Sequence, residues 1–190
     1  MSDSKSILCM LILMRLKTEL LSFDRLRLHK SALILNVFSA RDCFDIDDES
    51  LVYYPTIDRL ASEIKKLQTE SGVDTATTLQ SQLKICDSRI VESYKRSTPY
   101  IIQSAGFVHS ITDNETLILA SAIIGLVHRC KSASVGQIET LLKANDYKFD
   151  RKATVSVAVN LDKSKVLTIT DAGYCLSDSM KDVAEYVRLI

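Results

Sequence analysis

The fold of this chain is decided near its end, by residues 134–176, SVGQIETLLKANDYKFDRKATVSVAVNLDKSKVLTITDAGYCL. Ser134 and Asp150 each precede a segment with helical apolar periodicity, which is the pattern of two capped helices separated by a turn. Residues 165–170 then alternate along the chain, residues 171–173 form a turn, and residues 174–176 return. The stretch therefore predicts two helices followed by a β-hairpin.

The flanking segments extend this pattern. Residues 112–115, Thr-Asp-Asn-Glu, are rich in helix-capping side chains and open a further helix, while a last helix is expected over residues 183–189. Helices followed by a hairpin, in this order, are typical of a winged helix-turn-helix, a fold that grips DNA or another protein. We predict that domain over residues 113–190. Its expected core comprises Leu117, Ile124, Val127, Ile138, Leu141, Val155, Val159 and Ile169.

The first part of the chain, residues 1–112, also predicts mostly helices. They are expected over residues 6–21 and 23–38, from Pro55 to a cap at Gly72, over 76–86, and from Ser88 to an interruption at 95–99. A short helix over 100–105 should end at Gly106, and residues 107–111 should form a strand. We therefore expect a mainly α fold of two winged helix-turn-helix domains with small β-wings, residues 1–112 forming a divergent, helical one.

Composition supports a helical protein and limits its partners. Glycine and proline together supply only seven of 190 residues, which leaves little material for long loops. The net charge is zero, with fourteen basic and fourteen acidic residues through Thr112 and ten of each after it. A protein that binds nucleic acid by itself usually carries a basic domain or tail. DNA contact is therefore expected only from a local patch or within a larger assembly.

The sequence contains none of the motifs that we sought for catalysis. It lacks GxxxxGK[ST], GxGxxG, GxSxG and HExxH, and its five cysteines include no CxxC pair. The acidic residues of segment 42–49 lack the spacing of a calcium loop and are expected to be solvated. The apolar run 7–14 is too short to span a bilayer. We expect a cytoplasmic protein that is not an enzyme and uses no cofactor or metal.

Two groups of residues are candidates for binding. In a DNA-reading winged helix, the third helix enters the major groove and the wing touches the backbone. The residues expected to do so here are Arg151, Lys152, Ser156, Asn160, Lys163 and Lys165. Asp150, Asp162 and Asp171 oppose a purely DNA-binding role, so sequence-specific reading, nonspecific contact within a complex and binding of a protein all remain open.

The second group is expected at the first two helices. A helix that is apolar on every side must be buried somewhere, and a small domain seldom buries two such surfaces. We therefore expect a partner-binding surface that comprises Leu8, Leu11, Leu13, Arg25, Arg27 and Lys30. The competing interpretation is an unusually thick internal core.

The segment FDRLRLHK at residues 23–30, followed by SALIL, resembles the middle components of ABC three-component defence systems, including the accessory subunit of Lamassu-type systems. The segment 100–106, a short helix that ends in glycine, is also similar. The resemblance implies a non-enzymatic tandem winged-helix subunit of an anti-phage or anti-plasmid complex. Such a subunit would link an SMC-like ATPase to an effector protein, such as a nuclease, and could contact DNA through the complex. The alternative is a stand-alone winged-helix transcription regulator.

Overall fold

The structure, a computed structural model, is mainly helical and describes residues 4–20, 24–39, 43–44, 46, 53–144 and 147–178. The chain divides into two compact units, of which unit 1 comprises residues 1–47 and 52–110, and unit 2 comprises residues 48–51 and 111–190. The expectation of a mainly α fold is confirmed. Most of the expected acidic loop at 42–49 and all of the expected helix at 183–189 lie outside the described residues.

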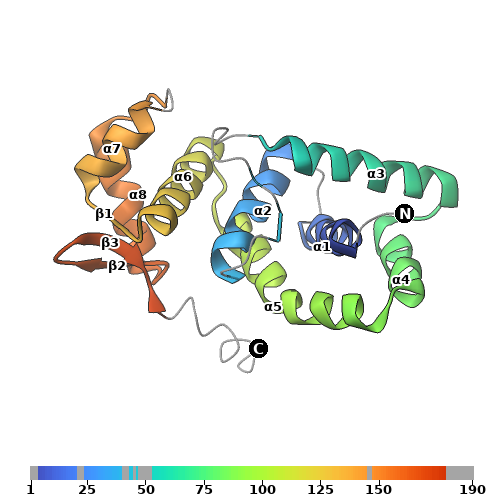
Figure 1. Cartoon of the computed structure of the whole chain (residues 1–190). Coiled ribbons are helices and arrows are strands. Elements are labelled where there is room, and N and C mark those ends of the chain that lie inside the picture. The colour runs from blue at the N-terminus through green and yellow to red at the C-terminus, as the bar shows by residue number, and fades with distance from the viewer. Residues whose placement is uncertain are drawn as a thin grey trace. The chain divides into compact units, whose positions relative to one another are not determined.

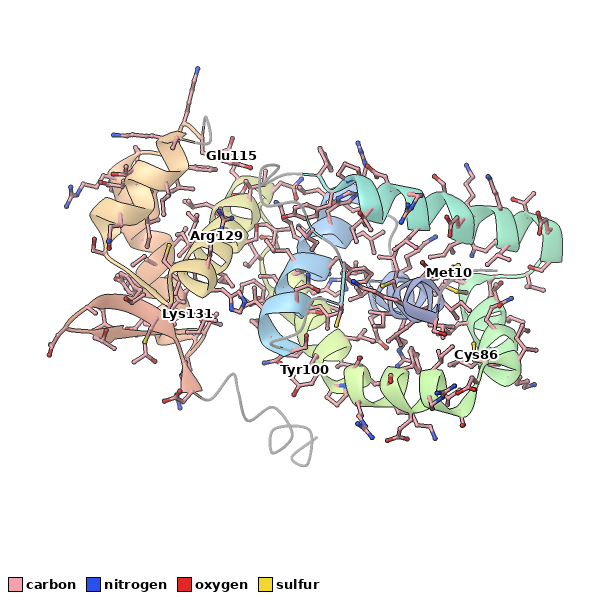
Figure 2. All side chains as sticks on the ribbon, in the orientation of Figure 1. Met10, Cys86, Tyr100, Glu115, Arg129 and Lys131 are labelled. Carbon is pink, nitrogen blue, oxygen red and sulfur yellow. The ribbon has the colours of Figure 1, made fainter. Side chains whose placement is uncertain are left out.

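Unit 1 is built from five helices in its described part: α1 (Ser4–Glu19), α2 (Arg25–Ser39), α3 (Pro55–Ser71), α4 (Thr75–Ile85) and α5 (Ser88–Ser110). Helix α1 packs against each of the other four, and Figure 1 shows it nearly end-on with α2, α3, α4 and α5 around it. Figure 2 labels Met10 on this helix, where side chains of the surrounding helices converge. The described part of unit 1 contains no strand.

The central position of α1 follows from its composition. Residues 7–14 are apolar without interruption, so no orientation of the helix leaves a polar face for water at that point. Leu11, Leu13 and Met14 have no exposed surface, and Leu20 just after the helix is buried as well. The expected partner surface at Leu11 and Leu13 is therefore wrong for this chain, because the surrounding helices cover both side chains. The thick internal core is what the structure contains.

The boundaries of α3 and α4 follow the local chemistry of the chain. Pro55 is the first residue of α3, and Gly72 ends it with a φ of 65° while its N–H bonds to the carbonyl of Gln68. Asp74 then caps α4 by accepting a hydrogen bond from the Thr77 N–H at 2.8 Å. On α3, Ile57, Leu60 and Ile64 recur at three- and four-residue spacing and form a buried stripe.

Helix α5 corrects the prediction for residues 88–111. Pro99 lies inside the helix, and neither it nor Gly106 ends it. Residues 107–110, which we expected in a strand, form its last turn. The buried residues Ile101, Ala105 and Val108 recur at helical spacing, so burial of one continuous stripe offsets the cost of a proline in the interior.

The described part of unit 2 consists of α6 (Asn114–Cys130), β1 (Ser132–Ala133), α7 (Val135–Ala144), α8 (Arg151–Lys163), β2 (Leu167–Thr170) and β3 (Gly173–Leu176). Its three strands form an antiparallel sheet in the order β1-β3-β2. The hairpin register pairs Thr170 with Gly173. Three caps agree with the sequence: Asp113 accepts from Thr116, Asp150 accepts from Ala153, and Ser134 and Gln137 form a reciprocal pair.

The core of unit 2 partly corrects the expected one. Leu117, Ile124, Val127 and Ile138 are fully buried, whereas Leu141 and Val159 are only half-buried. Val155 is 36% exposed and Ile169 is 61% exposed. Helix α8 instead buries Thr154, Val157, Ala158 and Leu161. Thr154 tolerates burial because its hydroxyl donates to the Asp150 carbonyl at 3.0 Å, so no polar group is left without a partner.

Gly173 is the residue that allows the sheet to close. Its φ is 114°, and a Cβ atom at this position would lie 2.7 Å from backbone atoms of Ala133 and Ser134. Strand β3 pairs with β1 at this level, where Ala133 lies opposite Tyr174. A side chain at residue 173 would therefore push the two strands apart, which explains the glycine after the turn.

Candidate functional sites

The first candidate site is the exposed surface of α8. Arg151, Lys152, Ser156, Asn160, Lys163 and Lys165 are all exposed, the first five on α8 and the last just after it. Lys152, Ser156 and Asn160 follow one another at four-residue spacing and so share one face of the helix. Lys165, just after the helix, has a left-handed backbone conformation with a φ of 57°. All six predicted residues thus lie at the surface of unit 2.

The charge of this surface is mixed. The Nη1 atom of Arg151 lies 3.6 Å from Oε2 of Glu139 on α7, so part of its charge is already balanced. Asp150 is engaged as the cap of the helix, and Asp162 and Asp171 lie close in sequence to Lys163 and Lys165. Two apolar side chains, Val155 on α8 and Ile169 on β2, are also exposed. Chemically, the surface can contact both polar and apolar groups.

The expected partner-binding residues of unit 1 are largely engaged within that unit. Leu8 is half-buried, and Lys30 has no exposed surface. Arg27 donates from Nη1 to the Val108 carbonyl at 2.8 Å, which ties α2 to α5. Arg25 is exposed, but it pairs with Asp58 of α3 through two hydrogen bonds of 2.9 and 2.6 Å. The six residues therefore do not form one open surface.

Arg25 belongs to a cluster that the sequence did not reveal. His29 lies beside it on α2, and its Nε2 is 3.1 Å from Oδ1 of the same Asp58. The Nδ1 atom of His29 accepts the backbone N–H of Tyr54 at 2.7 Å. Nδ1 is therefore unprotonated, and the neutral ring places its proton on Nε2, where it donates to Asp58. The interacting residues are 25 to 33 positions apart in the sequence, and no local spacing signals such a cluster.

The electrostatics of the cluster follow from these contacts. The two hydrogen bonds from Arg25 hold the pKa of Asp58 below its usual range. Burial lowers the pKa of His29, although the neighbouring Asp58 opposes this shift. With both ring nitrogens engaged by protein groups, His29 has no lone pair available to act as a general base. The cluster therefore joins α2, α3 and the residue before α3.

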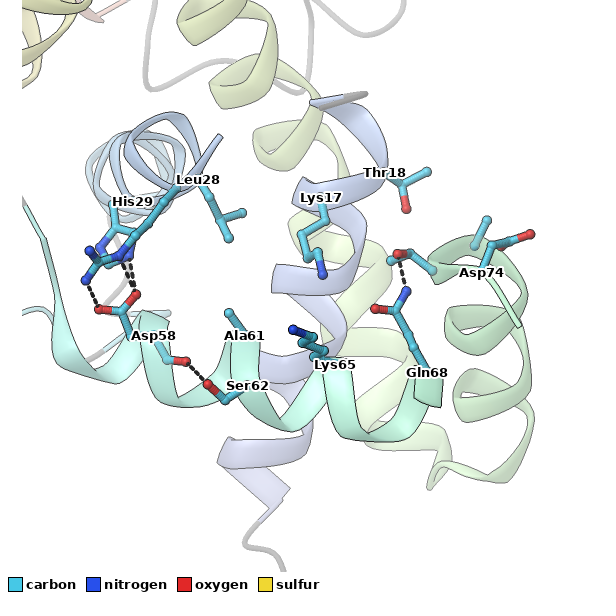
Figure 3. Close-up of a pocket in the computed structure, with 13 residues that line it drawn as sticks. Lys17, Thr18, Leu28, His29, Asp58, Ala61, Ser62, Lys65, Gln68 and Asp74 are labelled. Atoms are coloured by element: carbon cyan, nitrogen blue, oxygen red, sulfur yellow. Dashed lines mark hydrogen bonds and ion pairs between the residues drawn. The ribbon is translucent and has the colours of Figure 1, made fainter. Parts of the chain in front are cut away.

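The second candidate site is a pocket beside this cluster. It has a volume of about 770 Å³ and is lined by parts of α1, α2, α3 and the start of α4. Figure 3 shows Lys17 of α1 and Lys65 of α3 extending into the same space. Leu28 and Ala61 supply apolar surface, and Ser62 lies near the Asp58 end. Lys17 is half-buried, and this burial lowers its pKa.

No protein-family model, no curated protein and no solved structure matches this chain. Within the described ranges, no group of histidine, cysteine and acidic residues is arranged to hold a metal ion. None of the helices in those ranges combines the length and the apolar character needed to cross a bilayer.

Proposed function

We propose that unit 2 is a winged helix and that the chain is a non-enzymatic binding subunit. The order α6, β1, α7, α8, β2, β3 supports the first part, because it is the order of helices, short strand and hairpin in that fold. Pairing of β1 with β3, in the sheet order β1-β3-β2, is consistent with it. In this assignment α8 is the third helix, and β2 with β3 forms the wing. The winged-helix assignment applies to unit 2 and does not extend to unit 1.

The observation that carries the binding function is the composition of the exposed surface of α8 and β2. Four basic side chains lie near three acidic ones in the sequence, Asp150, Asp162 and Asp171, and Val155 and Ile169 are exposed on the same two elements. A surface for the phosphate backbone would be more uniformly basic. A protein partner can match both charges and cover the two apolar side chains. We therefore propose that the main ligand of this surface is a protein, and that the surface contacts DNA only within a complex.

The resemblance at residues 23–35 and 100–106 is the basis on which we propose a kind of partner. We propose an SMC-like ATPase, with the chain linking that ATPase to an effector in a defence complex. The expected sites of contact are Lys152, Ser156 and Asn160 on α8, together with Ile169 on the wing. The first two helices, which the sequence proposed for this role, are replaced here by α8, because α1 forms the core of unit 1.

Affinity purification from the native host tests this proposal. The tagged chain should retain an ATPase with long coiled coils, and the double variant Lys152→Glu, Ser156→Glu should lose it. The matched control is Gln80→Glu, Lys84→Glu on α4, which has the same spacing, exposure and change of charge. If the control also loses the partner, or if no such ATPase is retained by the parent, the proposal is wrong.

The alternative function is that of a winged-helix transcription regulator. The exposure of all six predicted polar residues on and after α8 favours it. A regulator is normally a symmetric dimer that reads a specific DNA sequence. Light scattering coupled to size-exclusion chromatography distinguishes the two functions, because a regulator should be a stable dimer and an unpartnered subunit should not.

A further inference from the structure

We propose that the pocket of unit 1 binds a small organic phosphate, with Lys17 and Lys65 holding its phosphoryl group. The volume of about 770 Å³ lies in the range of small-molecule sites in proteins. Four helices supply the walls, so the residues that line it come from separated parts of the chain. The inference concerns unit 1 and does not depend on the function proposed for unit 2.

The acidic groups at the pocket are already engaged by protein. Asp58 accepts two hydrogen bonds from Arg25 and faces His29, which balances its charge within the cluster. Asp74 accepts from the Thr77 N–H as the cap of α4, and this bond lowers its pKa. The Asp74 carboxylate already caps the N-terminus of α4. An anion in the pocket would therefore be bound by the lysines and not by that helix end.

Basic side chains outnumber acidic ones in the lining of the pocket, with Lys17, Arg25 and Lys65 against Asp58 and Asp74. Lys17 reaches it from α1 and Lys65 from α3, and their amino groups extend into the space between these helices (Figure 3). Lys65 forms no ion pair with another described residue. A phosphate monoester carries about −1.5 to −2 charges at pH 7. It therefore matches two ammonium groups better than a carboxylate with a single charge does.

The remaining lining suits the organic part of such a ligand. Leu28, Ala61 and Ala76 offer apolar contact, while the hydroxyl oxygens of Thr18 and Ser62 retain lone pairs that can accept hydrogen bonds. Burial lowers the pKa of Lys17, and a bound anion would offset that penalty. A ligand of the size of a nucleoside monophosphate fits these features.

Calorimetric titration of the full chain tests the proposal with adenosine monophosphate, inorganic phosphate and adenosine as probes. The monophosphate should bind saturably, inorganic phosphate more weakly, and adenosine at least tenfold more weakly than the monophosphate. Lys65→Met and Lys17→Met should each weaken binding of the monophosphate tenfold or more. Lys66→Met is the matched control, because Lys66 is an exposed neighbour on α3 that does not line the pocket.

The variants separate loss of binding from loss of folding. Lys65 is exposed, so Lys65→Met should keep the melting temperature of the parent even if Lys17→Met lowers it. Absence of saturable binding of both phosphate probes overturns the proposal. Equal affinity for adenosine, or equal effects of Lys65→Met and Lys66→Met, overturns it as well, because the phosphoryl group or the pocket would then not determine binding.

Discussion

His29 makes the stability of unit 1 depend on pH. Its Nδ1 accepts the Tyr54 N–H, so protonation of the ring in the folded chain requires that bond to break. Burial already lowers the pKa of His29 in the fold below the usual value of 6.5. Just below pH 6.5, the unfolded chain therefore binds more protons than the folded chain does. We predict that the free energy of unfolding falls as pH decreases through this window.

Denaturant unfolding of the parent and of His29→Gln between pH 5 and pH 8 measures this effect. The variant is expected to show a smaller slope near pH 6, whatever its absolute stability. His109→Gln serves as the control, because His109 is exposed, and it should keep the slope of the parent. Identical slopes for the parent and His29→Gln would contradict the role given to His29.

Lys30 is a buried cation in the same unit. It has no exposed surface, its ammonium lies 5.7 Å from the centroid of the Tyr54 ring, and burial lowers its pKa to about 8. Between about pH 8 and the unfolded value of 10.5, the unfolded chain binds more protons, so stability rises with pH in that window. The shift corresponds to about 3 kcal/mol over the whole window.

Lys30→Met removes this titration while keeping a long apolar side chain. We predict that the parent gains up to about 3 kcal/mol of unfolding free energy relative to the variant between pH 7.5 and pH 10.5. Unfolding curves at several pH values measure the gain. Lys84→Met on the exposed surface of α4 is the control and should show no such trend. A difference that does not change with pH would show that Lys30 is not held in its charged, desolvated form.

At the scale of elements, α1 is the centre of unit 1 and should behave as core. We predict that Leu13→Ala lowers the free energy of unfolding by about 2–5 kcal/mol, because it leaves a cavity where the side chain is fully buried. Leu8→Ala on the same helix should cost less, since Leu8 is only half-buried. Chemical denaturation measures both. If both substitutions lowered the free energy of unfolding by the same small amount, Leu13 would lie at a surface and not in the core.

The elements also indicate how far the sequence could predict this fold. Capping residues such as Asp113 and Asp150, and the turn before Gly173, act within a few residues, so their effects were predictable from local chemistry. The face that α8 buries was not. Val155 and Val159 were as plausible as Val157 and Leu161, and the outcome depends on which face the neighbouring elements cover. Thr154 can be buried there although it is polar, because its hydroxyl donates a hydrogen bond to the Asp150 carbonyl.

In helix α5, the prediction was wrong because it gave local propensity too much weight. Pro99 and Gly106 predict interruptions from local propensity, but packing of one long buried stripe outweighs them. The candidate sites also differ in whether local sequence could predict them. Exposure of Lys152, Ser156 and Asn160 was predictable because all three side chains are polar and recur at four-residue spacing on one helix. The pocket and the cluster at His29 join residues from several helices, and a single sequence carries no signal for such pairs.

For the whole molecule, charge limits what DNA can contribute to binding. Basic and acidic residues balance in the complete chain, and they also balance before and after Thr112. The basic residues of α8 and its flank number four: Arg151, Lys152, Lys163 and Lys165. Arg151 is already near Glu139. A patch of this size can displace only a few counterions from DNA.

We therefore predict weak DNA binding by the isolated chain, with a slope of log K against log salt of about −3 to −4 at most. Arg151→Glu, Lys152→Glu should abolish this binding without unfolding unit 2, because both side chains are exposed and acidic residues are favourable in the first turn of a helix. Fluorescence anisotropy over a series of salt concentrations measures the slope. Lys95→Glu, Arg96→Glu on α5 makes the same change in charge and should leave the affinity within about twofold of the parent. Tight, sequence-specific binding at physiological salt would instead identify a transcription regulator, because such affinity requires contacts to base edges in addition to phosphate contacts.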